Sequence, residues 1–198
     1  MGKGLSPTKY SFQAFNFLIF PLDEVKNYKN KKIMITIDKN KSININQFKN
    51  MNQILQINQV TIYDCFEYFQ KEESLVMWCN ECKALLPSKK QKFIYNGSNI
   101  LIIILNRGEM EVKLDYYESI DLKNFILKKD RISMIYDLYG VVTYLKGSGD
   151  KGHYVASCKS PCNNKWYRYN DKIVTPIMDM QKEIIDFENS YILFYQKR

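Results

Sequence analysis

Residues 132–170 read ISMIYDLYGVVTYLKGSGDKGHYVASCKSPCNNKWYRYN and decide the expected fold. The run at 132–145 is apolar and rich in β-branched and aromatic side chains, which favours a strand. A glycine-rich turn follows, and then two shorter strand-like runs at 153–158 and 165–169. The six residues between these two runs suit a hairpin loop, so we expect them to be neighbouring antiparallel strands.

The rest of the chain contains more candidate strands than candidate helices. SFQAFNFLIFPL at 11–22 is an extended aromatic strand, NILIIIL at 99–105 suits a strand buried on both faces, and SYILFYQKR at 190–198 suits a last strand. Residues 61–75 show helical spacing of apolar side chains, with Thr61 as the N-cap. No alternating strand–helix–strand pattern occurs, so we predict an α+β fold built mainly on an antiparallel sheet.

A stretch rich in Lys, Asn and Ile, at about 26–60, stands apart from this pattern. Within it KIMITID at 32–38 alternates like a strand, and the remainder has the character of a loop or an insertion. We expect residues 1–10 to form a flexible N-terminus and residues 11–198 to form one domain that includes this insertion.

Composition and charge exclude several classes of protein. The net charge of +8 comes from 29 basic and 21 acidic residues, but the lysines are scattered and no nucleic-acid-binding motif occurs, so we expect no nucleic-acid partner. No apolar run approaches the roughly 20 residues that span a bilayer, so no membrane association is expected. Five cysteines without a secretion signal do not predict a disulfide framework. We expect a monomeric cytoplasmic or nuclear protein.

His153 is the only histidine of the chain. A symmetric hairpin of 153–158 with 165–170 places it opposite Asn170, with the Cβ atoms roughly 4.5–5.5 Å apart. The Asn170 carbonyl then accepts the Nδ1–H, fixes the tautomer and leaves Nε2 free to take a proton. A single histidine is more often packed or solvated than catalytic. The catalytic interpretation therefore depends on Asn170 and on the glycines that crowd the approach to His153, at 147, 149 and 152.

Cys79 and Cys82 have the spacing of a zinc knuckle, CNEC. Tetrahedral zinc requires four ligands, so this pair is half of a structural site. Redox chemistry is an alternative for an isolated CxxC, although no thioredoxin-like βαβ pattern surrounds it.

The order of these motifs resembles the ubiquitin-specific proteases, which are papain-like cysteine deubiquitinases with a fold described as fingers, palm and thumb. The matching elements are a tyrosine-rich strand, a glycine-rich loop, Gly-His-Tyr, then Trp-Tyr-x-Tyr-Asn-Asp and Val-Thr-Pro. The separation of 17 residues between His153 and Asn170 is the spacing of that family. NILIIILNRG is similar to its core strand, and the similarity extends from about Ser11 to the C-terminus, apart from the Lys/Asn-rich stretch.

The resemblance implies a role for each matched residue. His153 would be the general base, Asn170 its orienting partner, and Asp171 a secondary candidate for that orienting role. Gly152 and Tyr154 would line the narrow channel that takes the C-terminal tail of ubiquitin. Ubiquitin and ubiquitinated proteins would be the partners, and catalysis would need no cofactor.

The family's nucleophile lies in a motif resembling Gly-Asn-Thr-Cys-Tyr near the start of its domain, and the 198 residues contain no such motif. Its second CxxC zinc pair likewise comes from upstream of the region matched here. The resemblance therefore implies a C-terminal, fingers-and-palm portion of a deubiquitinase domain that is inactive by itself. The alternative is a truncated pseudoenzyme that binds ubiquitin without cleaving it.

Overall fold

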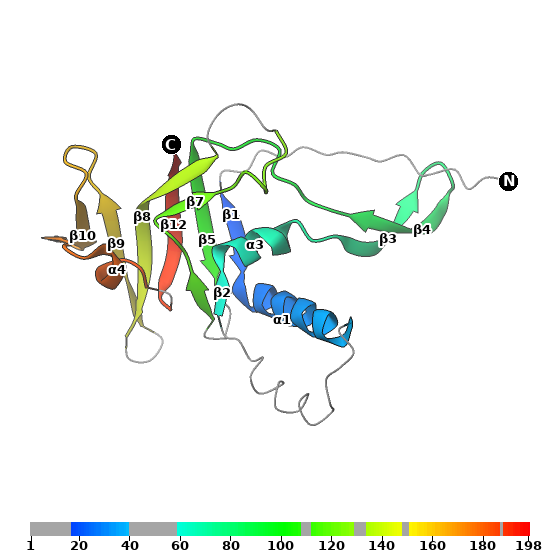
Figure 1. Ribbon diagram of the computed structural model, residues 1–198, viewed down its shortest axis with the longest axis horizontal. Helices are drawn as coiled ribbons and strands as arrows, with labels where there is room; N and C mark the ends of the chain where they lie inside the picture. The colour runs from blue at the N-terminus through cyan, green and yellow to red at the C-terminus, as the bar shows by residue number, and fades with distance from the viewer. Residues whose placement is uncertain (1–16, 40–58, 108–111, 129–133, 148–150, 187) are drawn as a thin grey trace, which may run out of the picture.

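The computed structural model describes residues 17–39, 59–107, 112–128, 134–147, 151–186 and 188–198. The expected flexible N-terminus and much of the Lys/Asn-rich stretch lie outside these ranges. The central sheet is formed by strands β1 (Leu18–Pro21), β5 (Ile100–Asn106), β7 (Ser119–Asp121), β8 (Ile135–Lys146), β9 (Gly152–Lys159), β10 (Trp166–Asn170), β11 (Ile173–Pro176) and β12 (Ser190–Lys197). Figure 1 shows this sheet, whose strand order is β1-β5-β12-β8-β9-β10-β11, with β7 paired to β8.

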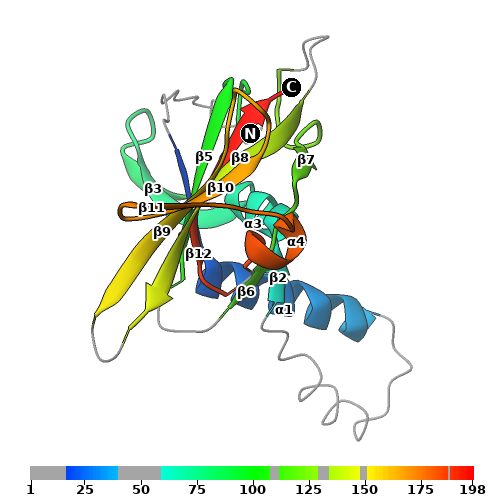
Figure 2. The same ribbon diagram turned by 90° about the vertical axis from the view of Figure 1, so that its left-hand side faces the viewer.

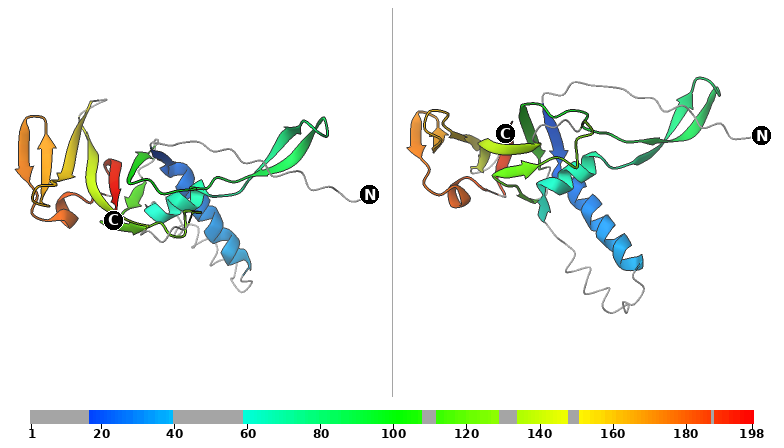
Figure 3. Two further views of the ribbon diagram at one scale, coloured as in Figure 1. Left: turned by 90° about the horizontal axis from the view of Figure 1, so that it is seen from above. Right: turned by 45° about the horizontal axis from the view of Figure 1, so that its top comes forward.

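Shorter elements surround the sheet. They are helices α1 (Leu22–Lys39), α3 (Ile62–Phe69) and α4 (Met180–Glu183), and strands β2 (Gln59–Thr61), β3 (Glu73–Cys79), β4 (Ala84–Lys90) and β6 (Lys113–Asp115). The hairpin of β3 and β4 projects away from the sheet in both views of Figure 3. Among the described helices, none is both long and apolar enough to cross a membrane.

Most neighbouring strands of the sheet are antiparallel, as predicted, but β1 and β5 run parallel, with Leu18 beside Ile103. A parallel pair requires a long crossover, and here the chain between β1 and β5 includes α1, α3 and the β3–β4 hairpin. The fold is therefore α+β with a mixed sheet.

The core lies on one face of the sheet. Ile103 and Leu105 of β5 are completely buried, whereas Ile100 is 40% exposed and Ile104 is half-buried. This alternation shows that β5 buries one face only. The prediction of a strand buried on both faces was therefore wrong.

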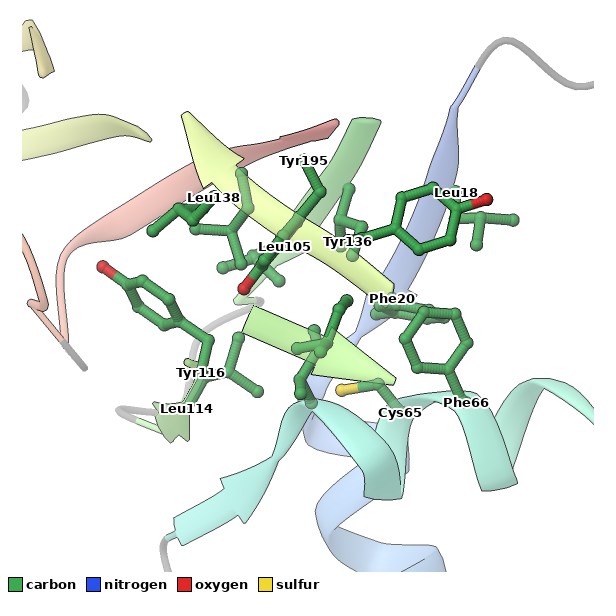
Figure 4. Packing of buried hydrophobic residues seen from close by; sticks show 14 of the residues in the cluster. Leu18, Phe20, Cys65, Phe66, Leu105, Leu114, Tyr116, Tyr136, Leu138 and Tyr195 are labelled. Atoms are coloured by element: carbon green, nitrogen blue, oxygen red, sulfur yellow. The ribbon is translucent and has the colours of Figure 1, made fainter. Parts of the chain in front are cut away.

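Helix α3 packs its apolar side against this buried face, as Figure 4 shows at close range. The ring of Phe66 meets the ring of Phe20 edge to face, with centroids 5.2 Å apart, and Cys65 lies beside it. Cys65 is completely buried, which confirms its interpretation as a small hydrophobic residue, and burial raises the pKa of its thiol. Leu22 of α1 belongs to the same buried cluster. Figure 2 shows α1 and α4 with the molecule turned by 90° about the vertical axis.

The start of α3 is closed by a capping box. Thr61 is the N-cap, as predicted: the Asp64 N–H donates to Thr61 Oγ1 at 3.1 Å, and the Thr61 N–H donates to Asp64 Oδ2 at 2.7 Å. Lys29 of α1 also donates to Asp64 Oδ2, at 2.8 Å. Burial raises the pKa of Asp64, but the hydrogen bonds from Lys29 and Thr61 outweigh it and lower that pKa overall. The helix ends at Phe69, before the predicted boundary at residue 75.

Helix α1 replaces the strand predicted for residues 32–38, so that prediction was wrong. Leu22 and Val25 are three residues apart and both completely buried, which fixes one helical face against the core. Asp23 and Glu24 lie in the first turn, where negative charge stabilises the helix dipole. Once a helix has begun, each added residue contributes one more backbone hydrogen bond. That gain lets α1 continue through residues 32–38, although several of them are β-branched.

Candidate active site

His153 and Asn170 lie on adjacent antiparallel strands, β9 and β10, as predicted. The register differs from the predicted one, because the ladder pairs Ala156 with Tyr169. Continued by one step, it sets Asn170 against Val155 rather than against His153. The shift is two residues, and since side chains alternate with a period of two, both remain on one face of the sheet.

His153 and Asn170 are in direct contact, with His153 Nε2 2.6 Å from Asn170 Oδ1. The predicted contact used Nδ1, and the two-residue shift explains the difference. Asn170 lies diagonally across the ladder, so the distal nitrogen of the ring reaches it. An amide oxygen only accepts hydrogen bonds, so Nε2 carries the hydrogen and Nδ1 is the atom left to take a proton.

Asp171 joins this pair at longer range. Its Oδ2 lies 3.9 Å from His153 Nε2, and its side chain is 80% exposed. Asp171 occupies the turn after β10 with a φ of 51°, a left-handed conformation that aspartate adopts more readily than most residues. Such an exposed carboxylate attracts a protonated imidazole only weakly. The structure thus brings together the three residues predicted to form the base and its partners.

Gly152 and Tyr154 point to the opposite face of β9 from His153, because neighbouring residues of a strand alternate. The Tyr154 ring lies 4.9 Å from that of Tyr144 and 5.6 Å from that of Tyr191, measured between centroids. A Cβ added at Gly152 would lie 1.9 Å from Tyr144 Oη, so the tyrosine ring covers the glycine. Sequence reasoning missed Tyr144; counting back across the hairpin from Tyr154 would have found it. The channel role of Gly152 and Tyr154 stays a prediction.

Gly152→Ala is expected to destabilise the chain by about 1–3 kcal/mol, because the new methyl group must displace the Tyr144 ring. The backbone of Gly152 is not left-handed, so the cost is steric. Urea unfolding of the wild type and the variant measures the loss. In a Tyr144→Ala background the same substitution is expected to cost less than about 0.5 kcal/mol. An undiminished cost there would contradict the steric explanation.

A cavity of about 520 Å³ opens on the same face as the His153–Asn170 pair. Arg168 of β10 lines it and donates a hydrogen bond to the backbone oxygen of Glu183, which joins α4 to the sheet. Asn170 and the buried Ser157 also line it. The remaining charged residues at its wall are Lys113, Lys182, Glu183, Asp186 and Glu188. Sequence spacing does not indicate this cavity, because its walls come from segments far apart in the chain.

No cysteine is hydrogen-bonded to His153, and all five lie within the described residues. Cys158 lies on β9 but faces the side opposite to His153, and burial raises the pKa of its thiol. Cys162 is exposed in the turn before β10, and Cys65 is in the core. The structure therefore sets the predicted base beside its predicted orienting partner, and no thiol of the described residues is hydrogen-bonded to that base.

Cys79 and Cys82 flank the turn between β3 and β4. The Cys82 N–H donates to Cys79 Sγ at 3.4 Å. The backbone N–H of Cys82 is the main cause that lowers the pKa of Cys79, and the hydrogen bond to Cys79 raises the pKa of Cys82. Within the described ranges no group of three or more His, Cys, Asp or Glu residues could hold a metal ion. Two thiols supply two of the four ligands of tetrahedral zinc, and the predicted half-site at Cys79 and Cys82 stays a prediction.

Comparison with known proteins gives a consistent match. The family model described as ubiquitin carboxyl-terminal hydrolase matches residues 11–195. Ubiquitin carboxyl-terminal hydrolase 8 of Saccharomyces cerevisiae is 28% identical over 158 residues, covering 69% of this chain and 32% of that protein. Ubiquitin carboxyl-terminal hydrolase 12 of the same yeast is 33% identical over 153 residues, covering 70% of this chain and 12% of that protein. Ubiquitin carboxyl-terminal hydrolase 2 of Gallus gallus is 32% identical over 150 residues, covering 70% of this chain and 41% of that protein. The chain thus spans less than half the length of these relatives.

Solved structures show the same partial match. The SAGA Ubp8/Sgf11/Sus1/Sgf73 DUB module bound to ubiquitin aldehyde contains a chain that superposes with a TM-score of 0.57 at 28% identity, covering 71% of this chain and 35% of that one. A related module bound to monoubiquitin gives the same TM-score, with 71% and 34% covered.

Proposed function

The chain belongs to the ubiquitin carboxyl-terminal hydrolase family, and from this premise we propose that it is the base-bearing portion of a thiol-dependent deubiquitinase. Its substrates are ubiquitin conjugates, and the bond cleaved follows the C-terminus of ubiquitin. The observation that supports this most directly is the 2.6 Å contact between His153 Nε2 and Asn170 Oδ1, beside a cavity on the same face of the sheet.

The reaction assigns each group one task. Asn170 holds the imidazole through Nε2–H, so Nδ1 accepts the proton of an incoming thiol. The thiolate attacks the carbonyl carbon, and the imidazolium gives its proton to the leaving amine. Water then releases the acyl group, with His153 again acting as the base. The thiol comes from a segment other than these 198 residues.

The second candidate function is a ubiquitin-binding module without activity. It is favoured by one observation: His153 is hydrogen-bonded to none of the five cysteines, all of which the structure describes. The related structure that holds monoubiquitin makes ubiquitin the partner to test for both functions. A cytoplasmic or nuclear location and a monomeric state belong to either proposal.

The isolated chain is expected to release no fluorophore from the C-terminus of ubiquitin above background, because a base without a nucleophile cannot form an acyl-enzyme. It is also expected to form no adduct with an electrophilic ubiquitin probe. Joined on one polypeptide to the part of the yeast hydrolase 8 that its match to this chain leaves uncovered, it is expected to release the fluorophore, and iodoacetamide should abolish that release.

Two outcomes would overturn parts of this proposal. Labelling of the isolated chain at any of its five cysteines would show that the nucleophile lies within it. A joined protein that folds, as judged by circular dichroism, and binds ubiquitin without turnover would favour the binding module.

A further inference from the structure

Within the described strands, the end of β9 that carries His153 is paired on one side only. The ladder of β9 with β10 ends three residues short of His153, at Ala156. On the other side, the ladder of β9 with β8 ends one pair beyond His153, at Gly152 and Lys146. Strand ends open more readily than strand centres, because fewer contacts hold them. The contact of 2.6 Å between His153 and Asn170 therefore depends on what holds this end of β9 in place.

The ring of Tyr144 packs against this strand end, on the face opposite to the imidazole. Tyr144 belongs to β8 and pairs with Tyr154 directly across the ladder, with the ring centroids 4.9 Å apart. The same ring extends over Gly152 and fills the space where a Cβ of that residue would lie. Gly152 and Tyr154 are the two sequence neighbours of His153, so one aromatic ring contacts β9 on both sides of the base.

Tyr144 is itself anchored to the interior of the sheet. Its N–H donates to the backbone oxygen of Asn189 at 2.9 Å, in the turn that precedes β12. The ring of Tyr154 packs in turn on the ring of Tyr191 of β12, at 5.6 Å between centroids. Both contacts lead to β12, which lies between β5 and β8 in the middle of the sheet. The exposed end of β9 is thereby joined to a strand that is paired on both sides.

We propose that Tyr144 is a positioning residue for His153, an inference that rests on the proposed role of His153 as the base. Its ring holds the end of β9 so that the imidazole stays in contact with Asn170. Because Tyr144 lies on the opposite face, it acts through the backbone of β9 and not by touching the reacting atoms. A misplacement of about 1 Å at a catalytic group lowers the rate about a hundred-fold, so a small loosening of the strand end is enough to slow the reaction.

Hydrogen exchange on the full 198-residue chain tests the positioning without any turnover. Tyr144→Ala is expected to speed the exchange of the backbone amides of residues 152–154 about tenfold or more, because the strand end opens more often. NMR adds a second measurement, since His153 is the only histidine and gives the only imidazole signals. The signal of the hydrogen-bonded Nε2–H should be present in the wild type and weakened in Tyr144→Ala.

Turnover in the joined enzyme tests the consequence for the reaction. Tyr144→Ala is expected to lower kcat about ten- to a hundred-fold and to change KM less than about threefold, because the loss concerns the placement of the base. Tyr144→Phe keeps the ring, so it should restore most of the lost kcat together with slow exchange at residues 152–154.

Tyr139→Ala is the matched control. Tyr139 lies five residues earlier on β8, and its ring makes a comparable contact, 6.1 Å from the ring of Phe194 between centroids. This variant also loses an aromatic contact of the sheet, but it should leave kcat and the exchange of residues 152–154 within about twofold of the wild type.

Three results would overturn the proposal. They are unchanged exchange at residues 152–154 in Tyr144→Ala, faster exchange there with unchanged kcat, and a loss of kcat that Tyr139→Ala equals. A joined wild type that folds without turnover would contradict the proposed function. The exchange rates and the Nε2–H signal would then still decide whether Tyr144 holds His153 against Asn170.

Discussion

His153→Ala, placed in the joined enzyme, is expected to lower kcat about a thousand-fold or more, because no other imidazole exists in the chain to accept the proton of the thiol. The measurement is fluorophore release from ubiquitin at saturating substrate, with circular dichroism to show that the variant folds. KM should change little, since the lost interaction is made in the transition state.

The partners of the base are expected to have graded effects. Asn170→Ala should lower kcat less than His153→Ala, because the Asp171 carboxylate, 3.9 Å from Nε2, partly takes over the orienting role. The double variant Asn170→Ala/Asp171→Ala should then have a lower kcat than either single variant. Lys172→Ala, exposed in the same turn, serves as the matched control and should leave kcat unchanged. Turnover within tenfold of the wild type in His153→Ala would remove His153 as the base.

Phe66→Ala is expected to destabilise the chain by about 3–5 kcal/mol. The Phe66 ring is completely buried and lies 5.2 Å from the ring of Phe20 and 5.3 Å from that of Phe125, so its removal leaves a cavity at the junction of α3 and the sheet. Domains of this kind are stable by only about 5–15 kcal/mol, so the loss is a large share of the total. Urea unfolding should show a lower midpoint at an unchanged slope.

Glu67→Ala provides the matched control for this substitution. Glu67 follows Phe66 on the same helix, but its side chain is 45% exposed and pairs with the exposed Lys32. Exposed ion pairs contribute less than about 1 kcal/mol, so this variant should unfold close to the wild type. A Phe66→Ala loss no larger than that of Glu67→Ala would contradict the assignment of Phe66 to the core.

The local features of this protein were predictable from its sequence. Thr61 caps α3 because a hydroxyl at that position satisfies a backbone N–H three residues ahead, which depends only on neighbours in the chain. His153 and Asn170 share one face because the turn between their strands is short and side chains alternate. The predicted register was wrong by two residues. Because side chains alternate with a period of two, this error still left His153 and Asn170 on the same face.

Long-range contacts decided the rest. Residues 32–38 alternate like a strand, yet they continue a helix that begins on the buried Leu22 and Val25, and no local pattern records that anchorage. The strand register fixes the separation of the Cβ atoms of His153 and Asn170. Because Asn170 lies diagonally across from His153, its side chain reaches Nε2 rather than Nδ1. Sequence alone determined which residues of the hairpin share a face, since the alternation of side chains along a strand is local. Which atoms meet is a property of packing between strands, because small shifts there change every distance at the site.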